Sequence, residues 1–408
     1  MKFLPNIVSR YDSAIWIRLF GTALTTFGSF MIRPFLAIYL YDKLDQNLLI
    51  SALIVGLQPA VGFITNLFAG KLSDHYGRKP IMLISLFLES LAMLCYAFAE
   101  SLPVFAVITM LNGAASCLFE PAASAQISDV VPMEKRSEVF ALLHMAANIG
   151  IAAGPFIGVS LYKVNPSMVF ILSSIVLFLY GMLVLWKVPE TLPASVNRTS
   201  MNTSLQTNQT KMGILKHKNL IWVTLTMLPF TLLYSQVVVV LPQHLKTNFD
   251  DYLNVYASLL TINAMIVVLF QILISKIAER FSVSKVIFFT YICLAITSIG
   301  YAWVSSFSLL IFVEIIFTVG EMLNGPQIRK VISLMAPPDF RGRYFAIFGA
   351  HEQISDAIGP TLGVFVLSQF GGGVWFTILS LLLLIAGFLQ KYLISHILQT
   401  KNRIVPKA

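Results

Sequence analysis

The sequence predicts an all-α integral membrane protein whose twelve transmembrane helices form two pseudo-symmetric halves of six helices each. Three observations support this prediction: the composition, the number of long apolar segments and an internal repeat. Of the 408 residues, 57% are hydrophobic and 12% are charged, and the mean hydropathy is +0.79. A soluble protein of this length needs far more polar surface.

Twelve apolar segments are long enough to cross a bilayer, which takes roughly 20 apolar residues per helix. The first segment is of full length and lacks a convincing cleavage site, so we expect a first transmembrane helix and not a signal peptide. The predicted spans cover residues 14–40, 49–70, 81–99, 103–128, 139–162, 167–186, 219–243, 253–275, 285–304, 306–328, 344–369 and 372–396.

Lysine and arginine residues gather on one side of the predicted membrane protein. With the N-terminus inside, the 28 Lys and Arg fall on the cytoplasmic side, except Lys43, Lys163 and Lys246 outside and Arg33 within the first span. This positive-inside pattern predicts a multi-pass protein of the cell (plasma) membrane with both termini in the cytoplasm. It also explains the net charge of +9 without a nucleic-acid partner.

A polar stretch separates the sixth span from the seventh. Residues 189–218 are rich in Ser, Thr and Asn, and we expect a flexible cytoplasmic linker there. The predicted N-terminal half therefore covers residues 1–188 and the C-terminal half residues 219–396. Residues 397–408 form the predicted cytoplasmic tail.

The two halves repeat each other at a shift of 205 positions, the separation of Arg136 and Arg341. With this shift, RSEVFALLHMAANIGIAAGPFIG aligns with RGRYFAIFGAHEQISDAIGPTLG, and without any gap Pro121 also aligns with Pro326. Two homologous membrane halves place a substrate site at their interface near the bilayer midplane, with rocking as the transport motion.

The fifth predicted helix carries small residues at a spacing of four. Ala146, Gly150, Gly154 and Gly158 share one helix face, which lets a neighbouring backbone approach closely. Pro155 removes one helical hydrogen bond and can bend the helix. The pattern fits plain packing as well as a tight contact that matters in one state of a transporter.

The predicted loop after the second span reads GKLSDHYGRKP, residues 70–80. Gly70 lets the helix end pack closely, and Gly77 suits a turn with positive φ. Asp74 can accept hydrogen bonds from a helix N-terminus or pair with Arg78. Arg78 and Lys79 also serve the positive-inside pattern, which is their simpler interpretation.

These two stretches carry a family resemblance. GKLSDHYGRKP resembles the loop signature of the major facilitator superfamily, and AANIGIAAGPFIG resembles the fifth-helix signature of its twelve-helix drug:proton antiporters. The resemblance covers the whole chain and implies the major facilitator fold with export instead of uptake. LFEPAASAQISD and VGEMLNGPQ are also similar to segments of multidrug antiporters. By that resemblance, Glu321 takes the place of a tenth-helix carboxylate involved in proton and drug binding.

The chain departs from the family pattern in two places. Thr109 stands four residues before Gly113, where the family places an arginine, so the usual proton-relay arginine is absent at that position. The second-half copy of the loop, SKIAERFSVSK, has lost its glycines, which favours Asp74 over Glu279 as the functional acid.

Six acidic residues fall within the predicted spans. Ionisable residues there are costly and usually face a cavity or a partner. Burial favours the protonated form of a carboxyl group, so such a group can exchange protons near neutral pH and, when ionised, hold a cationic drug. The six are Glu89, Glu120, Glu314, Glu321, Glu352 and Asp356.

Glu321 is the foremost candidate for proton coupling because it lies midway along the tenth span beside Gly320. Glu314 lies seven residues earlier on the same face and is a second candidate. The alternative to a functional role is that Glu314 forms an ion pair or lies near the outer interface of the membrane. Glu352 and Asp356 are four residues apart and share a face, where neighbouring carboxylates favour each other's protonation. A position of Glu352 near the cytoplasmic mouth is the alternative.

Arg33 needs a carboxylate partner or a water-filled cavity, because an unpaired arginine in a span is expensive. The sequence does not decide whether Glu120, Glu314 or Glu321 is the partner of Arg33. If Glu120 does not pair with Arg33, we expect it to be a proton-binding site. Glu89 is assigned a structural role, because the third helix is peripheral in the family that the chain resembles.

No phosphate-binding loop, cofactor fingerprint or soluble catalytic domain is found, and the three cysteines show no metal-site spacing. We therefore expect no enzyme, no cofactor and no metal, with the proton gradient as the energy source. We predict a monomeric, proton-coupled antiporter that exports lipophilic, cationic compounds or drugs and contributes to antibiotic resistance. Its predicted partners are small lipophilic substrates, protons and membrane lipids.

Two alternatives to this function remain at the level of the sequence. One is a proton-coupled exporter of a single physiological solute, such as a lipid, peptide or metabolite. The other is a non-transporting membrane sensor or scaffold on the same fold. The intramembrane acids argue against a scaffold, which gains nothing from their cost.

Overall fold

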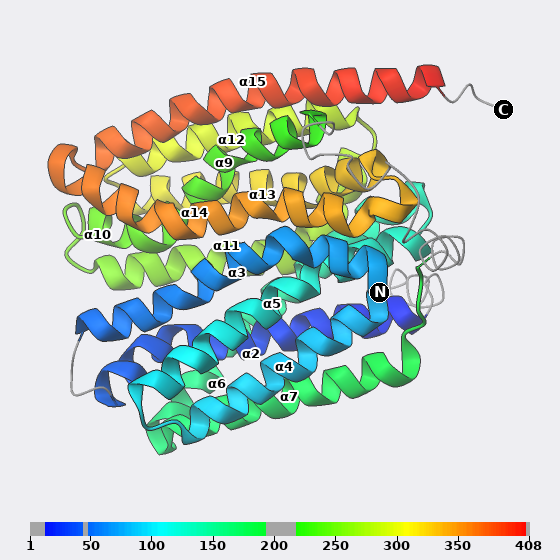
Figure 1. Cartoon of the computed structure of the whole chain (residues 1–408). Coiled ribbons are helices and arrows are strands. Elements are labelled where there is room, and N and C mark those ends of the chain that lie inside the picture. The colour runs from blue at the N-terminus through cyan, green and yellow to red at the C-terminus, as the bar shows by residue number, and fades with distance from the viewer. Residues whose placement is uncertain (1–12, 44–47, 193–217, 405–408) are drawn as a thin grey trace. The chain divides into compact units, whose positions relative to one another are not determined.

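The structure is a computed structural model that describes residues 13–43, 48–192 and 218–404 (Figure 1). In these ranges it consists of helices and connecting turns, without a strand. Eleven of the twelve predicted spans each coincide with one long helix, and the seventh covers a long helix and part of a short one, which confirms the predicted all-α architecture.

The chain divides into two compact units. Unit 1 comprises Met1–Leu205 and Pro337–Ala346, and unit 2 comprises Gln206–Ala336 and Ile347–Ala408. The helices of unit 1 are α2 (Ser13–Lys43), α3 (Leu48–Tyr76), α4 (Arg78–Phe98), α5 (Leu102–Val130), η1 (Met133–Lys135), α6 (Arg136–Val164) and α7 (Pro166–Lys187), together with η4 (Pro338–Phe340). The helices of unit 2 are α9 (Lys218–Val239), α10 (Leu241–Leu245), α11 (Tyr252–Ala278), α12 (Val283–Trp303), α13 (Phe307–Met335) and α15 (Gly372–Ile404). The first six residues of α14 (Arg341–Phe370) belong to unit 1 and the remainder to unit 2.

The six long helices of unit 1 form a bundle with an aromatic core. Helix α2 packs on α6 and α7, α3 packs on α5, and α4 packs on both α5 and α7. Phe170 of α7 lies between Tyr39 of α2 and Tyr96 of α4, with ring centroids 4.9 and 5.4 Å away. Aromatic pairs at this spacing add to the stability gained from their buried area.

Unit 2 repeats the packing of unit 1. Helix α11 packs on α13, α12 packs on α13 and α15, and α9 packs on α15. The helix bounds repeat as well: a shift of 205 positions places Arg78–Phe98 of α4 on Val283–Trp303 of α12, and Leu102–Val130 of α5 on Phe307–Met335 of α13. The sequence repeat therefore corresponds to a structural repeat of two six-helix bundles.

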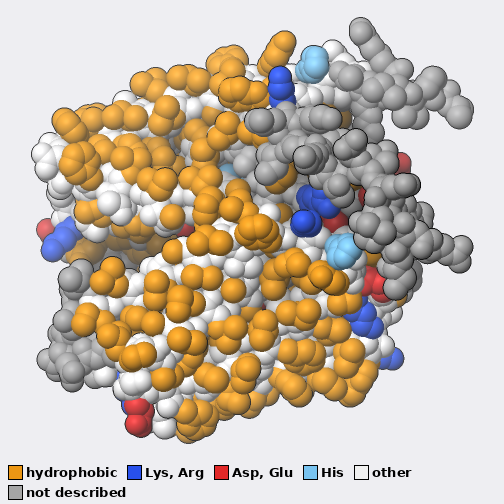
Figure 2. Space-filling model, in the orientation of Figure 1, with side chains coloured by type: hydrophobic (Ala, Val, Ile, Leu, Met, Phe, Trp, Pro, Cys, Tyr) orange, Lys and Arg blue, Asp and Glu red, His pale blue; other side chains and the backbone are white. Residues whose placement is uncertain are grey.

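The outer faces of the long helices are apolar. On the face shown in Figure 2, hydrophobic side chains cover the sides of the helices, whereas charged side chains lie toward the helix ends. Leu381, Ile385 and Phe388 of α15, for example, are each more than half exposed. Eleven helices of the described residues are long and apolar enough to cross a membrane; α14, which carries four charged residues between Arg341 and Asp356, is not among them.

The structure differs from the sequence prediction at three helix ends. The segment GKLSDHYGRKP is mostly helical and not a loop, because α3 continues to Tyr76 and α4 begins at Arg78. The predicted seventh span contains two helices, since α9 ends at Val239 and α10 follows. Helix α15 continues to Ile404, into the predicted tail. Most of the predicted linker, residues 193–217, lies outside the described residues.

Candidate functional site

Helix α13 carries a row of three polar side chains inside unit 2. Glu314, Thr318 and Glu321 are spaced by four and three residues, so they lie on one face of the helix. Their exposed fractions are 2%, 0% and 9%. Such burial of two carboxyl groups is expensive and requires polar partners.

Glu314 accepts hydrogen bonds from two neutral hydroxyl groups, one at its carboxylate and one at its backbone carbonyl. The hydroxyl of Tyr301, on α12, donates a hydrogen bond to Glu314 Oε2 at 2.6 Å. Thr318 Oγ1 donates to the backbone carbonyl of Glu314 at 2.7 Å. Among the described residues, Glu314 forms no ion pair with Lys or Arg. An ion pair of Glu314 with Arg33 stays a prediction, because the side chain of Arg33 is outside the described residues.

Residues of two other helices lie close to Glu321. Asn263 of α11 donates its Nδ2 hydrogens to Glu321 Oε2 at 2.8 Å and to Thr318 Oγ1 at 3.1 Å. Tyr234 of α9 lies near the Glu321 carboxyl group. We refer to Glu314, Thr318, Glu321, Asn263, Tyr234 and Tyr301 as the α13 carboxylate cluster.

Aromatic rings form one side of the α13 carboxylate cluster. The ring of Phe317 lies between those of Tyr234 and Tyr301, with centroids 5.1 and 6.3 Å away. Buried carboxylates next to aromatic faces provide the two attractions that a lipophilic cation needs, namely charge pairing and cation–π contact. Buried carboxyl groups can also take up protons, because burial favours the protonated form.

The other predicted acids lie elsewhere. Glu352 and Asp356 are exposed on α14, where their spacing puts them on one face as predicted. Glu120 of α5 is exposed and accepts a hydrogen bond from Ser124 at 2.8 Å. Glu89 is half-buried and accepts a hydrogen bond from Ser85. The side chain of Arg33 is outside the described residues, so its predicted carboxylate partner stays a prediction.

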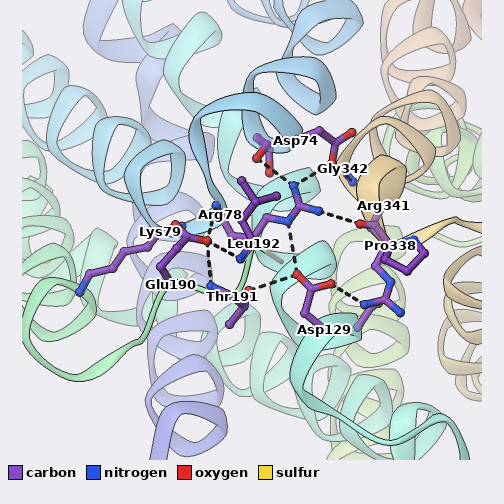
Figure 3. A network of polar contacts seen from close by, with 12 residues as sticks. Asp74, Arg78, Lys79, Asp129, Glu190, Thr191, Leu192, Pro338, Arg341 and Gly342 are labelled. Atoms are coloured by element: carbon purple, nitrogen blue, oxygen red, sulfur yellow. Dashed lines mark hydrogen bonds and ion pairs between the residues drawn. The ribbon is translucent and has the colours of Figure 1, made fainter. Parts of the chain in front are cut away.

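A second polar group, in unit 1, is centred on Arg78 at the start of α4 (Figure 3). Arg78 is fully buried, so the positive-inside pattern alone does not explain it. Its Nη1 donates to Asp74 Oδ1 at 2.7 Å, and its Nε to Asp129 Oδ2 at 3.3 Å. Asp129 also pairs with Arg341, so that one buried carboxylate joins two guanidinium groups.

Asp74 makes both of the contacts that its sequence position predicts. Besides pairing with Arg78, it accepts backbone hydrogen bonds from Gly342 at 2.9 Å and Arg343 at 3.0 Å, in the first turn of α14. Charge-assisted bonds to a helix N-terminus are among the stronger hydrogen bonds. Gly70 is required beside them, because a Cβ atom there would lie 2.5 Å from the backbone of Arg343.

Glu190, in the segment that follows α7, provides the N-terminal cap that α4 itself lacks. Gly77 precedes α4 with the predicted positive φ, 106°, and has no side chain to cap the helix. The carboxylate of Glu190 accepts hydrogen bonds from the backbone N–H groups of Arg78 and Lys79, both at 3.0 Å. The ammonium group of Lys79 donates to the carbonyl of Leu185. The chain after α7 is thereby fastened to the start of α4.

The small-residue face of α6 lies against the backbone of α2. A Cβ atom at Gly150 would lie 2.4 Å from the carbonyl oxygen of Ala23, and one at Gly154 would lie 2.8 Å from that of Phe27. Gly158 of the same face is also buried. The predicted close approach is therefore present in unit 1.

The repeat reproduces this contact in unit 2. Gly359 of α14, the counterpart of Gly154, lies against Ser235 and Gln236 of α9. Gln236 Nε2 donates to the carbonyl of Gly359 at 3.0 Å. Both glycines pack tightly on the first long helix of their own unit.

Sequence reasoning missed six residues of these sites, namely Asp129, Glu190, Tyr234, Asn263, Tyr301 and Thr318. It also counted Arg18 with the residues of the cytoplasmic side, whereas the structure buries this side chain at 2% exposed. Arg18 Nη1 donates to Tyr180 at 2.9 Å, and its guanidinium group lies over the ring of Phe119. An arginine within a predicted span is itself a signal of function or of a polar partner, and Arg18 lies within the span 14–40.

Comparison with known proteins agrees with this architecture. The family model of the Major Facilitator Superfamily matches residues 18–360 and 234–403. The chain is 34% identical to the uncharacterized MFS-type transporter YhjO of Bacillus subtilis over 96% of both chains. It is 27% identical to a Na⁺, Li⁺, K⁺/H⁺ antiporter of Planococcus maritimus, covering 95% of this chain and 97% of the relative.

More distant matches extend this picture. The chain is 26% identical to the multidrug resistance protein MdtG of Proteus mirabilis, over 88% of this chain and 90% of the relative. The crystal structure of the human organic anion transporter MFSD10 matches with a TM-score of 0.75 at 16% identity, covering 92% of this chain and 98% of that one. By sequence and by fold, the chain is a multi-pass membrane transporter that belongs to the major facilitator superfamily.

Proposed function

We propose that the protein is a proton-coupled antiporter that exports lipophilic, cationic compounds by alternating access. In this proposal it lies in the cell membrane with both termini in the cytoplasm, as the positive-inside pattern predicts. The observation that carries the proposal is the buried Glu321 carboxylate, which accepts a hydrogen bond from the neutral amide of Asn263 and lies near the aromatic rings of Tyr234 and Phe317.

The chemistry of exchange follows from two opposing effects on the Glu321 carboxyl group. Burial favours the protonated form, whereas hydrogen-bond donors and an arriving cation favour the ionised form. A cation that binds from the cytoplasmic side therefore displaces the proton. A proton that returns from the outer side releases the cation there, so that one group couples the two movements. Glu314, two helical turns away, is the second proton-binding candidate in the same cluster.

The names of two relatives support this proposal. MdtG is a multidrug resistance protein, and the relative from Planococcus maritimus exchanges alkali cations for protons. The latter supports a second candidate, the exchange of small inorganic cations for protons. Oxygen atoms of Glu314, Glu321 and Thr318 are of the kind that such cations bind. Export of one physiological solute and a non-transporting role are the remaining alternatives. They gain support if none of the cations tested below is transported.

The test is cation movement in liposomes that contain the purified protein and an imposed pH gradient. Ethidium, Na⁺ and K⁺ serve as the probes, and liposomes without protein serve as the control. We expect ethidium to move in the direction opposite to the protons, and this movement should stop when a protonophore removes the pH gradient. Movement of Na⁺ or K⁺ alone would support the second candidate, and movement of none of the probes would contradict cation export.

We expect Asp74→Asn to lower the transport rate by roughly tenfold or more while changing substrate affinity less than twofold. Asp74 receives bonds from Arg78 and from the backbone of Gly342 and Arg343, and hydrogen bonds to a charged group each contribute about 1.5–3 kcal/mol. Asparagine keeps one acceptor and places an N–H group against a donor.

The measurement for Asp74 is initial rates in liposomes together with equilibrium binding in detergent. Asp339→Asn is the matched control, because Asp339 is exposed in the neighbouring turn. An unchanged transport rate in Asp74→Asn would show that this network does not govern the conformational change.

A further inference from the structure

Asn263 is oriented by two acceptors at once. Its Nδ2 atom donates to Glu321 Oε2 at 2.8 Å and to Thr318 Oγ1 at 3.1 Å, which uses both amide hydrogens. Turning the amide over would bring Oδ1 against the carboxylate of Glu321, where two acceptors repel each other. The position of the Asn263 Oδ1 atom is therefore fixed by Glu321 and Thr318.

The Oδ1 atom of Asn263 receives no hydrogen bond from any described residue, although the side chain is half-buried. It is a hydrogen-bond acceptor held next to the carboxylate. A second amide nearby goes further: Asn324, three residues after Glu321 on α13, is 1% exposed, and its buried Oδ1 atom has no hydrogen-bond partner among the described residues. A buried acceptor that lacks a donor is unfavourable, and a ligand that supplies an N–H group relieves this cost.

We propose that Asn263 makes this site selective for protonated amines over cations that carry no N–H group. The inference rests on the proposed binding of cations by Glu321 and specifies their chemical class. A primary ammonium group brings three hydrogen-bond donors. One can bind the Glu321 carboxylate and another the Asn263 Oδ1 atom, while the apolar part of the molecule contacts the rings of Tyr234 and Phe317.

A quaternary ammonium ion has the charge but none of these donors. It can pair with the Glu321 carboxylate through space and with the aromatic faces, yet it leaves the Asn263 Oδ1 atom without a donor. Sites built to hydrogen-bond a ligand discriminate strongly against analogues that lack the hydrogen-bonding group. An acceptor that the bound ligand covers without supplying a donor corresponds to a difference in affinity of roughly tenfold.

The test compares two ligands of the same aromatic framework, 1-naphthylmethylamine and its N,N,N-trimethyl derivative. Their dissociation constants are measured for the purified protein at neutral pH, where both ligands are cations. We expect the wild type to bind the amine about tenfold more tightly. Asn263→Leu should reduce this ratio to within about twofold, mainly by weakening the amine, because leucine has a similar volume and no amide.

Asn254→Leu is the matched control on the same helix, since Asn254 is exposed and its side chain, among the described residues, hydrogen-bonds only Asp251. It should keep the wild-type ratio. Asn263→Ser, which retains a hydroxyl acceptor, should give an intermediate ratio and replaces the leucine variant if that variant does not fold in a thermal-unfolding assay.

Equal affinities of the two ligands for the wild type, or an unchanged ratio in Asn263→Leu, would overturn the proposal. If both ligands bind and release a proton but with equal affinity, the selectivity alone is wrong and the proposed function stands. If neither ligand binds, the proposed function fails and the selectivity fails with it.

Discussion

Replacing Glu321 by glutamine is expected to weaken the binding of a lipophilic cation by about tenfold or more and to remove the pH dependence of that binding. Glutamine keeps the shape of the side chain and can still accept the hydrogen bond from Asn263, but it stays neutral. A charge pair at the effective dielectric constant of such a site contributes on the order of 1–4 kcal/mol. The variant should therefore fold and lose affinity mainly for cations.

The measurement for Glu321 is the dissociation constant of ethidium from pH 5 to 9. Because proton and cation compete for one carboxylate, the affinity of the wild type should rise as the pH rises, and that of Glu321→Gln should stay flat. Glu100→Gln removes an exposed carboxylate outside the helices and should behave as the wild type. An equal titration in Glu321→Gln and the wild type would move the shared site to Glu120 or Asp356.

Replacing Gly154 by leucine is expected to abolish transport. Even the Cβ atom would lie 2.8 Å from the carbonyl oxygen of Phe27 and 3.0 Å from the backbone nitrogen of Met31, on α2. The obstacle is backbone and not a flexible side chain, so the two helices must move apart. Overpacking of this kind costs about 1–3 kcal/mol of stability. The displacement of α2 from α6 also changes the packing of the helices in unit 1.

Substitutions of increasing size at Gly154 distinguish this steric effect from a general destabilisation of the helix. Gly154→Ala should reduce transport partly and Gly154→Leu completely. Gly56→Leu is the matched control, because this glycine of α3 is exposed and a Cβ atom there meets nothing within 4 Å. Transport rates are measured in liposomes at equal protein insertion. Normal proton-coupled export by Gly154→Leu would show that the close contact with α2 is not needed.

Much of the fold is predictable from the sequence for a simple physical reason. A bilayer imposes a minimum length of apolar chain on every spanning helix, and this length is visible without any knowledge of the tertiary structure. The twelve predicted spans accordingly coincide, apart from the last residues of the seventh, with the twelve long helices of the described residues. The repeat is visible for a similar reason, since Gly154 and Gly359 occupy equivalent close contacts in units 1 and 2. Helix ends were less predictable: α3 and α4 continue through the charged motif and are interrupted only at Gly77.

The candidate site could be predicted only in part. Glu314 and Glu321 stand out because charge within a span is rare, and their spacing on one helix is readable from the sequence. The partners of these carboxylates cannot be predicted from the sequence. Asn263 and Tyr301 lie on other helices, and no pattern around them marks them as partners. Only the packing of α11 and α12 against α13 brings these groups within hydrogen-bond distance of the carboxylates.

The unit 1 network shows the same limit. Asp74 and Arg78 belong to a recognisable motif, and their pairing is predicted by their i, i+4 spacing. Asp129, which joins Arg78 to Arg341, lies 51 residues from Arg78 in the chain. No local pattern marks it as a partner. Glu190 likewise caps α4 from a distance of more than a hundred residues.

The exchange of a proton for a cation at Glu321 is tested most directly by proton release on ligand binding. Ethidium is added to the purified protein in a weakly buffered solution that contains a pH indicator, for the wild type and for Glu321→Gln. The account predicts that the wild type releases protons as it binds the cation and that the variant releases fewer or none. Saturating binding by the wild type without any proton release between pH 5 and 9 would contradict it.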